Sequence, residues 1–246
     1  MRRLLALSLL AVCLVAPAEA QRRRSVRFIS TPAVGGGPCH VFGLVPAGTK
    51  AGYLSTTPQG NVTFQITWIS DTPTRTHTTQ ATQSPAGNAE AVTILDGEVL
   101  GAIRTLKHLN VKTSTIAPVI GKVTTEVDIN YVPSLAAGPV DGWCVGNSWN
   151  TTGSPSLQTI VTKPPFGPQN TITQNAASEG VVEAVGEPRT AAGRQFNTVR
   201  YRSTSRVGTS VETSRTWVDM NLNIVIRQET LDGAGNVTTV TELVQL

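Results

Sequence analysis

The chain has 246 residues, with 20 basic and 16 acidic side chains and a formal net charge of +4. Hydrophobic residues make up 39% of it, which is enough for a packed core, and charged residues make up only 15%. These figures exclude a wholly disordered chain, a coiled coil and a collagen-like protein. After residue 20, no apolar run reaches the length of a transmembrane helix, so we expect no membrane-spanning segment in the mature protein.

The first twenty residues have the pattern of a secretory signal peptide. Arg2 and Arg3 precede an apolar stretch from Leu4 to Val15. Ala18-Glu19-Ala20 then offers small residues at the two positions that signal peptidase reads. We therefore expect cleavage after Ala20 and export to the periplasm or the extracellular space.

A flexible basic N-terminus, residues 21–36, would then begin the mature chain. It carries Arg22, Arg23, Arg24 and Arg27. Such a segment could touch anionic lipid, but we favour a solvated terminus that assists export. No basic patch with interleaved aromatic residues occurs later, so nothing indicates nucleic-acid binding.

Two cysteines, Cys39 and Cys144, remain once Cys13 leaves with the signal peptide. An even pair in an exported protein usually forms a disulfide. A redox pair would favour a Cys-x-x-Cys spacing, and the three histidines of the chain are scattered without a ligand pattern. We predict a structural disulfide between Cys39 and Cys144, and no metal site.

The first half of the mature chain, 37–162, has the alternation of antiparallel strands. Val62, Phe64, Ile66 and Trp68 alternate with polar residues, and residues 123–131 do the same. Further strands are expected near 39–45, 90–95, 111–117 and 157–162. We predict half-buried strands, each with one apolar and one wet face.

Two segments of this half depart from that pattern. Val99, Ile103 and Leu106 recur at helical spacing, so 98–109 is expected to form either a short helix or a twisted strand. Residues 72–83 are rich in Thr and poor in apolar residues, which indicates an exposed edge or a long hairpin rather than core.

A Pro-rich connection, 163–179, begins with Lys163-Pro164-Pro165 and separates this half from the C-terminal residues 180–246. Strand-like runs then follow at 181–186, 194–204, 208–218, 222–231 and 236–245. The short gaps between them predict a sequential antiparallel meander, which we assign to the same domain as the first half.

No catalytic sequence motif is present, and we predict a protein that is not an enzyme and has no cofactor. Glu126, Asp128 and Asn130 share one face of a strand, and could ligate calcium or act as an acid–base pair. Their alternation with apolar residues already explains them as a solvated face, which is the interpretation we favour.

Trp143 and Trp149 lie in an unusual stretch around Cys144. In an extended chain the two indoles would share a face, where they could line an apolar cavity or stack on a sugar ring. Packing around the disulfide is the more ordinary role and the one we favour.

Four short motifs give residues 180–246 a resemblance to exported bacterial proteins of uncharacterised function. They are Glu187-Pro188-Arg189-Thr190, Ala192-Gly193-Arg194-Gln195-Phe196, Thr216-Trp217 and Glu242-Leu243. Those proteins are similar in build to the periplasmic lipoprotein carriers. The resemblance implies a curved antiparallel half-barrel around an apolar groove.

The sequence thus predicts a mainly β protein with a strongly curved antiparallel sheet, a half-barrel or barrel-like, ending in a C-terminal meander with at most one or two short helices. The leading function is non-catalytic binding of an apolar ligand, such as a lipid or a lipoprotein, or of an envelope partner chain. The alternatives are a secreted structural or polysaccharide-binding module and, third, a hydrolase. The candidate ligand contacts are Trp68, Trp143, Trp149 and Trp217. We expect a partly open apolar cavity with at least one of Trp68, Trp143 and Trp217 on its wall.

Overall fold

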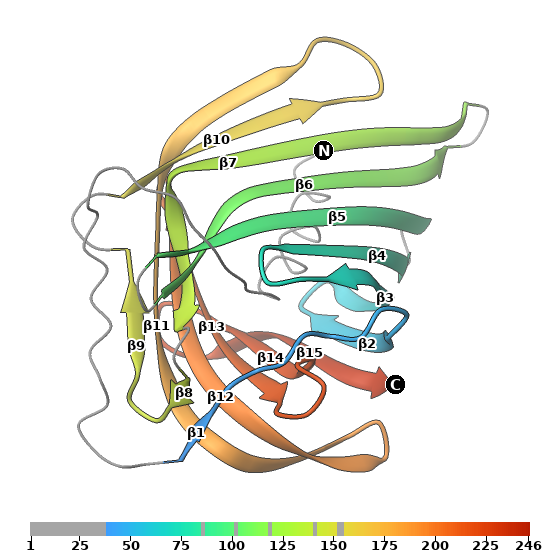
Figure 1. Ribbon diagram of the computed structural model, residues 1–246. Helices are drawn as coiled ribbons and strands as arrows, with labels where there is room; N and C mark the ends of the chain where they lie inside the picture. The colour runs from blue at the N-terminus through green and yellow to red at the C-terminus, as the bar shows by residue number, and fades with distance from the viewer. Residues whose placement is uncertain (1–37, 85–86, 101–102, 118–119, 140–141, 152–154) are drawn as a thin grey trace.

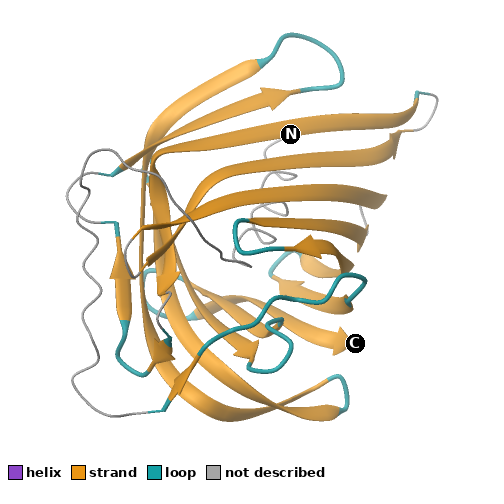
Figure 2. Ribbon diagram, in the orientation of Figure 1, coloured by secondary structure: helices purple, strands orange, loops and turns teal. Residues whose placement is uncertain are grey.

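The computed structural model describes residues 38–84, 87–100, 103–117, 120–139, 142–151 and 155–246. The expected signal peptide and the basic N-terminus, 21–36, lie outside these ranges. Within them the chain forms strands joined by turns and loops, without a helix (Figure 2). No helix there is long and apolar enough to cross a bilayer.

The strands alternate in direction along the chain (Figure 1). In chain order they are β1 (Cys39–His40), β2 (Lys50–Thr57), β3 (Gly60–Asp71), β4 (Arg75–Ser84), β5 (Gly87–Leu100), β6 (Ile103–Ala117), β7 (Gly121–Pro139), β8 (Trp143–Cys144), β9 (Ser148–Asn150), β10 (Ser156–Lys163), β11 (Asn170–Ala191), β12 (Arg194–Val207), β13 (Ser210–Asp219), β14 (Val225–Leu231) and β15 (Val237–Gln245).

Twelve of these strands close into an antiparallel barrel. Sequential hairpins run from β2 to β7 and from β10 to β15, and β7 pairs with β10. Two pairings complete the ring: β15 with β2, and β10 with β11. Closure removes the free sheet edges that would otherwise expose unpaired backbone groups. The predictions of a mainly β fold, a curved antiparallel sheet and a C-terminal meander are confirmed.

The two ends of the barrel differ. One end, which we call the mouth, carries the turns β2–β3, β6–β7, β10–β11, β12–β13 and β14–β15, because hairpins alternate between the ends of a meander. The opposite end, the plugged end, receives residues 39–49 and the short strands β8 and β9, which together we call the plug. In Figure 1 the blue segment of the plug runs from β1 across to β2.

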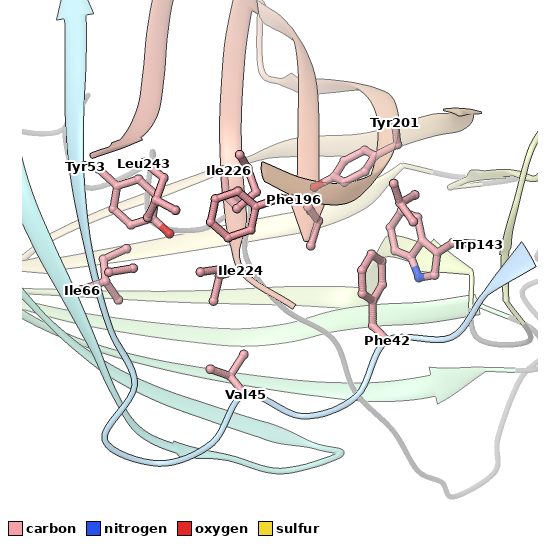
Figure 3. Close-up of a cluster of buried hydrophobic side chains, with 14 of the residues drawn as sticks. Phe42, Val45, Tyr53, Ile66, Trp143, Phe196, Tyr201, Ile224, Ile226 and Leu243 are labelled. Atoms are coloured by element: carbon pink, nitrogen blue, oxygen red, sulfur yellow. The ribbon is translucent and has the colours of Figure 1, made fainter. Parts of the chain in front are cut away.

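Apolar side chains of the plug extend into the barrel at this end. Phe42 and Val45 are buried, and the Phe42 ring lies 5.3 Å from that of Trp143 (Figure 3). The Val45 N–H donates to Asp71 Oδ2 at 2.8 Å. The Cys39–Cys144 disulfide joins β1 to β8, which confirms the predicted pairing. The plug is therefore held to the barrel by packing and a hydrogen bond, and the disulfide joins two segments of the plug to each other.

A ladder of alternating charges covers the outer face of the C-terminal meander. Arg215 lies 3.2 Å from Glu183 and 3.7 Å from Glu229, in each case nitrogen to oxygen. Arg227 continues the ladder, 2.9 Å from Glu229 and 3.1 Å from Glu242. Partial burial works against the charge of Arg227, but hydrogen bonds to these two carboxylates outweigh it and raise the pKa of the guanidinium. The ladder gives these strands a water-facing outer surface.

The structure corrects the helix alternative for residues 98–109. Residues 98–100 end β5 and 103–109 begin β6, so the twisted-strand alternative is the right one for them, and 101–102 lie outside the described residues. Register shifts at Asp96/Gly97 and Leu106/His108 change which side chains face inward. Such shifts give a strand an apolar spacing that imitates a helix.

Three predicted boundaries also change. Strand β4 lies between β3 and β5, so residues 75–83 are not an edge of the sheet. The Pro-rich connection shortens to the loop 164–169, because β10 ends at Lys163 and β11 begins at Asn170. Only Cys39 and His40 of the segment 39–45 form a strand, since the rest of it belongs to the plug.

Candidate functional site

The inner wall of the barrel is the candidate site, and one side of it is polar. A single row of paired positions crosses β2, β15, β14, β13 and β12, formed by Ser55, Thr241, Gln228, Thr216 and Tyr201. Directly paired residues share a face of a sheet. The Tyr201 ring lies 5.0 Å from that of Trp143 in the buried core, so the row faces inward. The next row toward the mouth, Thr239, Thr230, Ser214 and Ser203, is also hydroxylated.

The other side of the inner wall is apolar. A row across β5, β6, β7, β10 and β11 consists of Leu95, Leu109, Ile129, Ile160 and Ile172. The parallel row that contains Trp68 includes Thr93 and Val111, which places this apolar row on the inner face as well. Leu95, Leu109 and Ile129 are buried in one hydrophobic cluster. We call these rows the polar wall and the apolar wall, and β3 and β4 lie between their strands on one side of the barrel.

Several buried polar atoms on the inner face have no hydrogen-bond partner among the described residues. They include Thr216 Oγ1, Ser156 Oγ and the Tyr53 hydroxyl. Thr216 and Ser156 are fully buried, and burial raises the pKa of the Tyr53 hydroxyl. Buried polar groups in folded proteins are nearly always paired with protein or with water. Each of these atoms therefore lacks the hydrogen bond that burial ordinarily requires.

Elsewhere on the inner face the polar groups pair with each other. Gln158 Nε2 donates to the Tyr131 hydroxyl at 2.9 Å, and Gln174 Nε2 donates to Gln158 Oε1 at 2.9 Å. On the polar wall itself, the Thr241 hydroxyl donates to Ser55 Oγ at 3.1 Å. The unpaired state of Thr216 is thus a local feature of its position.

Water reaches the inner wall toward the mouth. Ile172 is 48% exposed although its row faces inward, and Ser203, Thr230 and Thr239 are only partly buried. Glu212 pairs with Ser205, and this pair lies two positions nearer the mouth than the pair Ser203–Ser214. Because residues two positions apart in a strand share a face, Glu212 faces inward too. Its side chain is exposed, yet the surrounding barrel still raises the pKa of the carboxyl by desolvation.

Three of the four tryptophans predicted as ligand contacts lie in one buried cluster. Trp143 and Trp149 have ring centroids 5.5 Å apart. Trp149 lies flat on Gly180 of β11, where any Cβ would come within 2.2 Å of the indole. Trp68 is buried in the same cluster, and its Nε1 is another unpaired inner atom.

Trp217 is separated from the other three tryptophans. It pairs with Arg200 and Arg227 on the outer face of β13. Its Nε1 donates to Glu187 Oε1 at 3.3 Å, and the Arg189 guanidinium lies 4.4 Å from the ring centroid. Cation–π contact therefore covers this indole on the outside of the barrel.

The acidic residues Glu126 and Asp128 lie on the outer face of β7. His108 Nε2 lies 3.0 Å from Asp128 Oδ1, and His108 Nδ1 lies 3.0 Å from Asp96 Oδ2. Asn110 Nδ2 donates to both Glu126 and Asp128. Among the described residues, no group of three or more His, Cys, Asp or Glu side chains is arranged to hold a metal ion.

The hydrogen bonds of this outer cluster set the pKa of its carboxyls. Burial acts to raise the pKa of Asp128, but hydrogen bonds from His108 and Asn110 and nearby positive charge outweigh it, so the pKa is lowered. A hydrogen bond from Asn110 is the largest cause of the lowered pKa of Glu126. The arrangement fits cross-strand support of the sheet, as the strand alternation indicates.

No protein-family model, curated protein or solved structure matches this chain.

Replacing Thr216 by Val should stabilise the ligand-free protein, by about 1–3 kcal/mol, because the change removes a buried hydroxyl that has no partner. Thr241→Val is the matched control in the same row. It should cost about 1 kcal/mol, because it removes the hydrogen bond to Ser55. Urea unfolding of both variants provides the comparison, and equal losses of stability would contradict this account of the row.

Asp128→Asn should lower stability at neutral pH by about 1 kcal/mol or less, as is usual for partly exposed polar contacts. The lowered pKa of Asp128 in the folded protein makes its contribution fully present above the ordinary value of 3.8 and lost as the pH falls below it. The difference between wild type and variant in urea unfolding should therefore shrink from pH 7 to pH 3. Glu90→Gln is the control, because the Glu90 side chain is 72% exposed. If the stability difference between wild type and Asp128→Asn grew in acid, the stabilising role assigned to the Asp128 carboxylate would be wrong.

Proposed function

We propose that this protein is an exported, non-catalytic binding protein that holds an amphiphilic ligand against the inner wall of its barrel. The observation that carries the proposal is the division of that wall into an apolar row and a hydroxylated row with unpaired buried hydroxyls. In a core that binds no ligand, the unpaired oxygens of Thr216 and Ser156 would only lower the stability of the protein, because burying an unpaired polar atom costs free energy. A ligand with an apolar chain and polar groups would satisfy both sides.

The apolar wall suits a single hydrocarbon chain. Burying about ten methylenes contributes roughly 8 kcal/mol at about 0.8 kcal/mol each. This is the free energy of micromolar binding, before the costs of association are subtracted. We expect hydrogen bonds between the head group and the polar wall to offset those costs, so that binding stays in the micromolar range.

The polar wall favours a hydroxylated head group without negative charge. Thr216, Ser203, Ser214 and Thr230 offer hydroxyls that both donate and accept hydrogen bonds. Glu212 faces the same space, and its raised pKa reflects the cost of placing negative charge there. A free fatty acid carboxylate would add a second negative charge, so it should bind more weakly than an uncharged amphiphile.

The mouth is the end by which we propose that the ligand enters. Large apolar side chains stand exposed on its hairpins, among them Ile116, Ile120 and Phe166. The plug closes the other end with a packed cluster. The resemblance of residues 180–246 to the lipoprotein carriers motivates the same class of ligand and stays a prediction. If the protein instead binds a partner chain or has a structural role, no amphiphile should bind.

The test uses a neutral single-chain probe, a pyrene-labelled monoacylglycerol, with the full-length mature protein. Wild type should bind it with micromolar affinity, measured by pyrene emission and by quenching of tryptophan. Ile172→Arg places a cation on the exposed part of the apolar wall and should weaken binding at least tenfold.

Thr173→Arg is the matched control, because Thr173 is the next residue along β11 and faces outward. It should bind the probe like wild type. Failure of the wild-type protein to bind, or equal binding by both variants, would reject the proposal. A pyrene fatty acid tested in parallel should bind more weakly than the monoacylglycerol.

A further inference from the structure

A second site lies at the plugged end of the barrel, outside the inner wall. It is a pocket of about 450 Å³ where the start of β12 meets the β13–β14 turn. Arg194, Asn197, Asp219 and Asn221 line it, with Phe196 and Leu222 as the apolar part. This volume falls within the range of small-ligand sites in proteins.

Asp219 is the feature that marks the pocket as a binding site. Its side chain is almost fully buried, and Oδ2 accepts the N–H groups of Leu222 at 2.7 Å and of Asn221 at 3.1 Å. Oδ1 is also buried and has no hydrogen-bond partner among the described residues. One carboxylate oxygen therefore holds the turn, and the other is unpaired in a residue that lines the pocket. An unpaired buried carboxylate oxygen is costly without such a donor.

Arg194 contributes a positively charged hydrogen-bond donor to the same pocket. Its guanidinium lies 5.2 Å from the ring centroid of Phe196. It forms no ion pair of 4.0 Å or less with any carboxylate in the described ranges, Asp219 included. The pocket thus offers an unpaired acceptor and an unpaired donor that do not neutralise each other.

This combination selects an uncharged ligand with several hydroxyls. A cation attracted by Asp219 would meet Arg194, and an anion attracted by Arg194 would meet Asp219. A hydroxyl can donate to Asp219 Oδ1 and accept from Arg194, and the amides of Asn197 and Asn221 can do both. Phe196 and Leu222 provide apolar surface for the C–H face of a ring.

We propose that this pocket binds one residue of a neutral saccharide. The site does not depend on the amphiphile proposed for the inner wall, because it uses different residues at the opposite end of the barrel. An exported protein meets saccharides as free sugars or as chains of a polysaccharide, and the pocket would take the same unit from either source.

The test measures binding of neutral sugars to the full-length mature protein by saturation-transfer NMR and calorimetry. Glucose, galactose, mannose and N-acetylglucosamine, with their β-linked disaccharides, form the panel. At least one should bind with an affinity in the millimolar range or better. Asp219→Asn should weaken that binding at least tenfold, because the amide keeps an oxygen for the turn and places a donor where the free acceptor was. Arg194→Gln should weaken it as well.

Asp232→Asn is the matched control. Asp232 Oδ1 accepts the N–H groups of Ala234 and Asn236 in the β14–β15 turn, the same role that Asp219 Oδ2 has in the pocket. This variant, and Ile172→Arg on the inner wall, should bind sugar like wild type. Absence of binding across the panel, or equal binding by Asp219→Asn and Asp232→Asn, would overturn the proposal. Binding of glycine but of no sugar would replace the saccharide with a zwitterion and overturn it too.

Discussion

Closure of a twelve-stranded barrel is the constraint on which the rest of this structure depends. An eight-stranded barrel is about as wide as its own inward side chains can fill, and wider barrels leave space inside. Here the pairings β15–β2 and β10–β11 close the wider ring. The two ends of the barrel differ in how this interior is filled.

At the plugged end the chain itself fills the space. Phe42, Val45 and the Trp143–Trp149 pair pack against Tyr201 and the neighbouring strands, and the Cys39–Cys144 disulfide holds this segment in place. The cross-link joins residues 105 positions apart, so it stabilises the fold mainly by restricting the unfolded chain. Toward the mouth no such segment is described. There the inner wall has a hydroxylated row and an apolar row that are partly exposed, which is the basis of our functional proposal.

The local sequence pattern predicted many strands of the barrel, but little about the function of its inner wall. Strand β3 was predicted from the alternation of Val62, Phe64, Ile66 and Trp68 with polar residues. The disulfide was predicted because an even pair of cysteines is expected to oxidise in an exported protein. The polar wall was hidden because the mouth half of β12 is polar on both faces. Arg202 and Arg206 point outward while Ser203 and Ser205 point inward, so the apolar stripe of Val199 and Tyr201 stops before this half of the strand.

Long-range register accounts for the other omissions. The hydrogen bond between Asp128 and His108 depends on which strands become neighbours, and so does the row of paired positions that contains Thr216. The Asp219 pocket joins two turns that hairpin signals predict separately. An unusual sequence feature was nonetheless available. Strands with Arg or Glu at one parity and Ser or Thr at the other indicate a sheet that is wet outside and polar inside, which is unusual for a simple packed core.

The most direct test of the proposed amphiphile is chemical. The protein is purified without detergent from the cells that naturally produce it, denatured and extracted with organic solvent, and the extract is quantified by mass spectrometry. We expect a near-stoichiometric single-chain amphiphile with an uncharged hydroxylated head group. An extract that holds only traces of bulk membrane lipid, in the proportions of the membrane, would show that water alone occupies the space and would contradict the account.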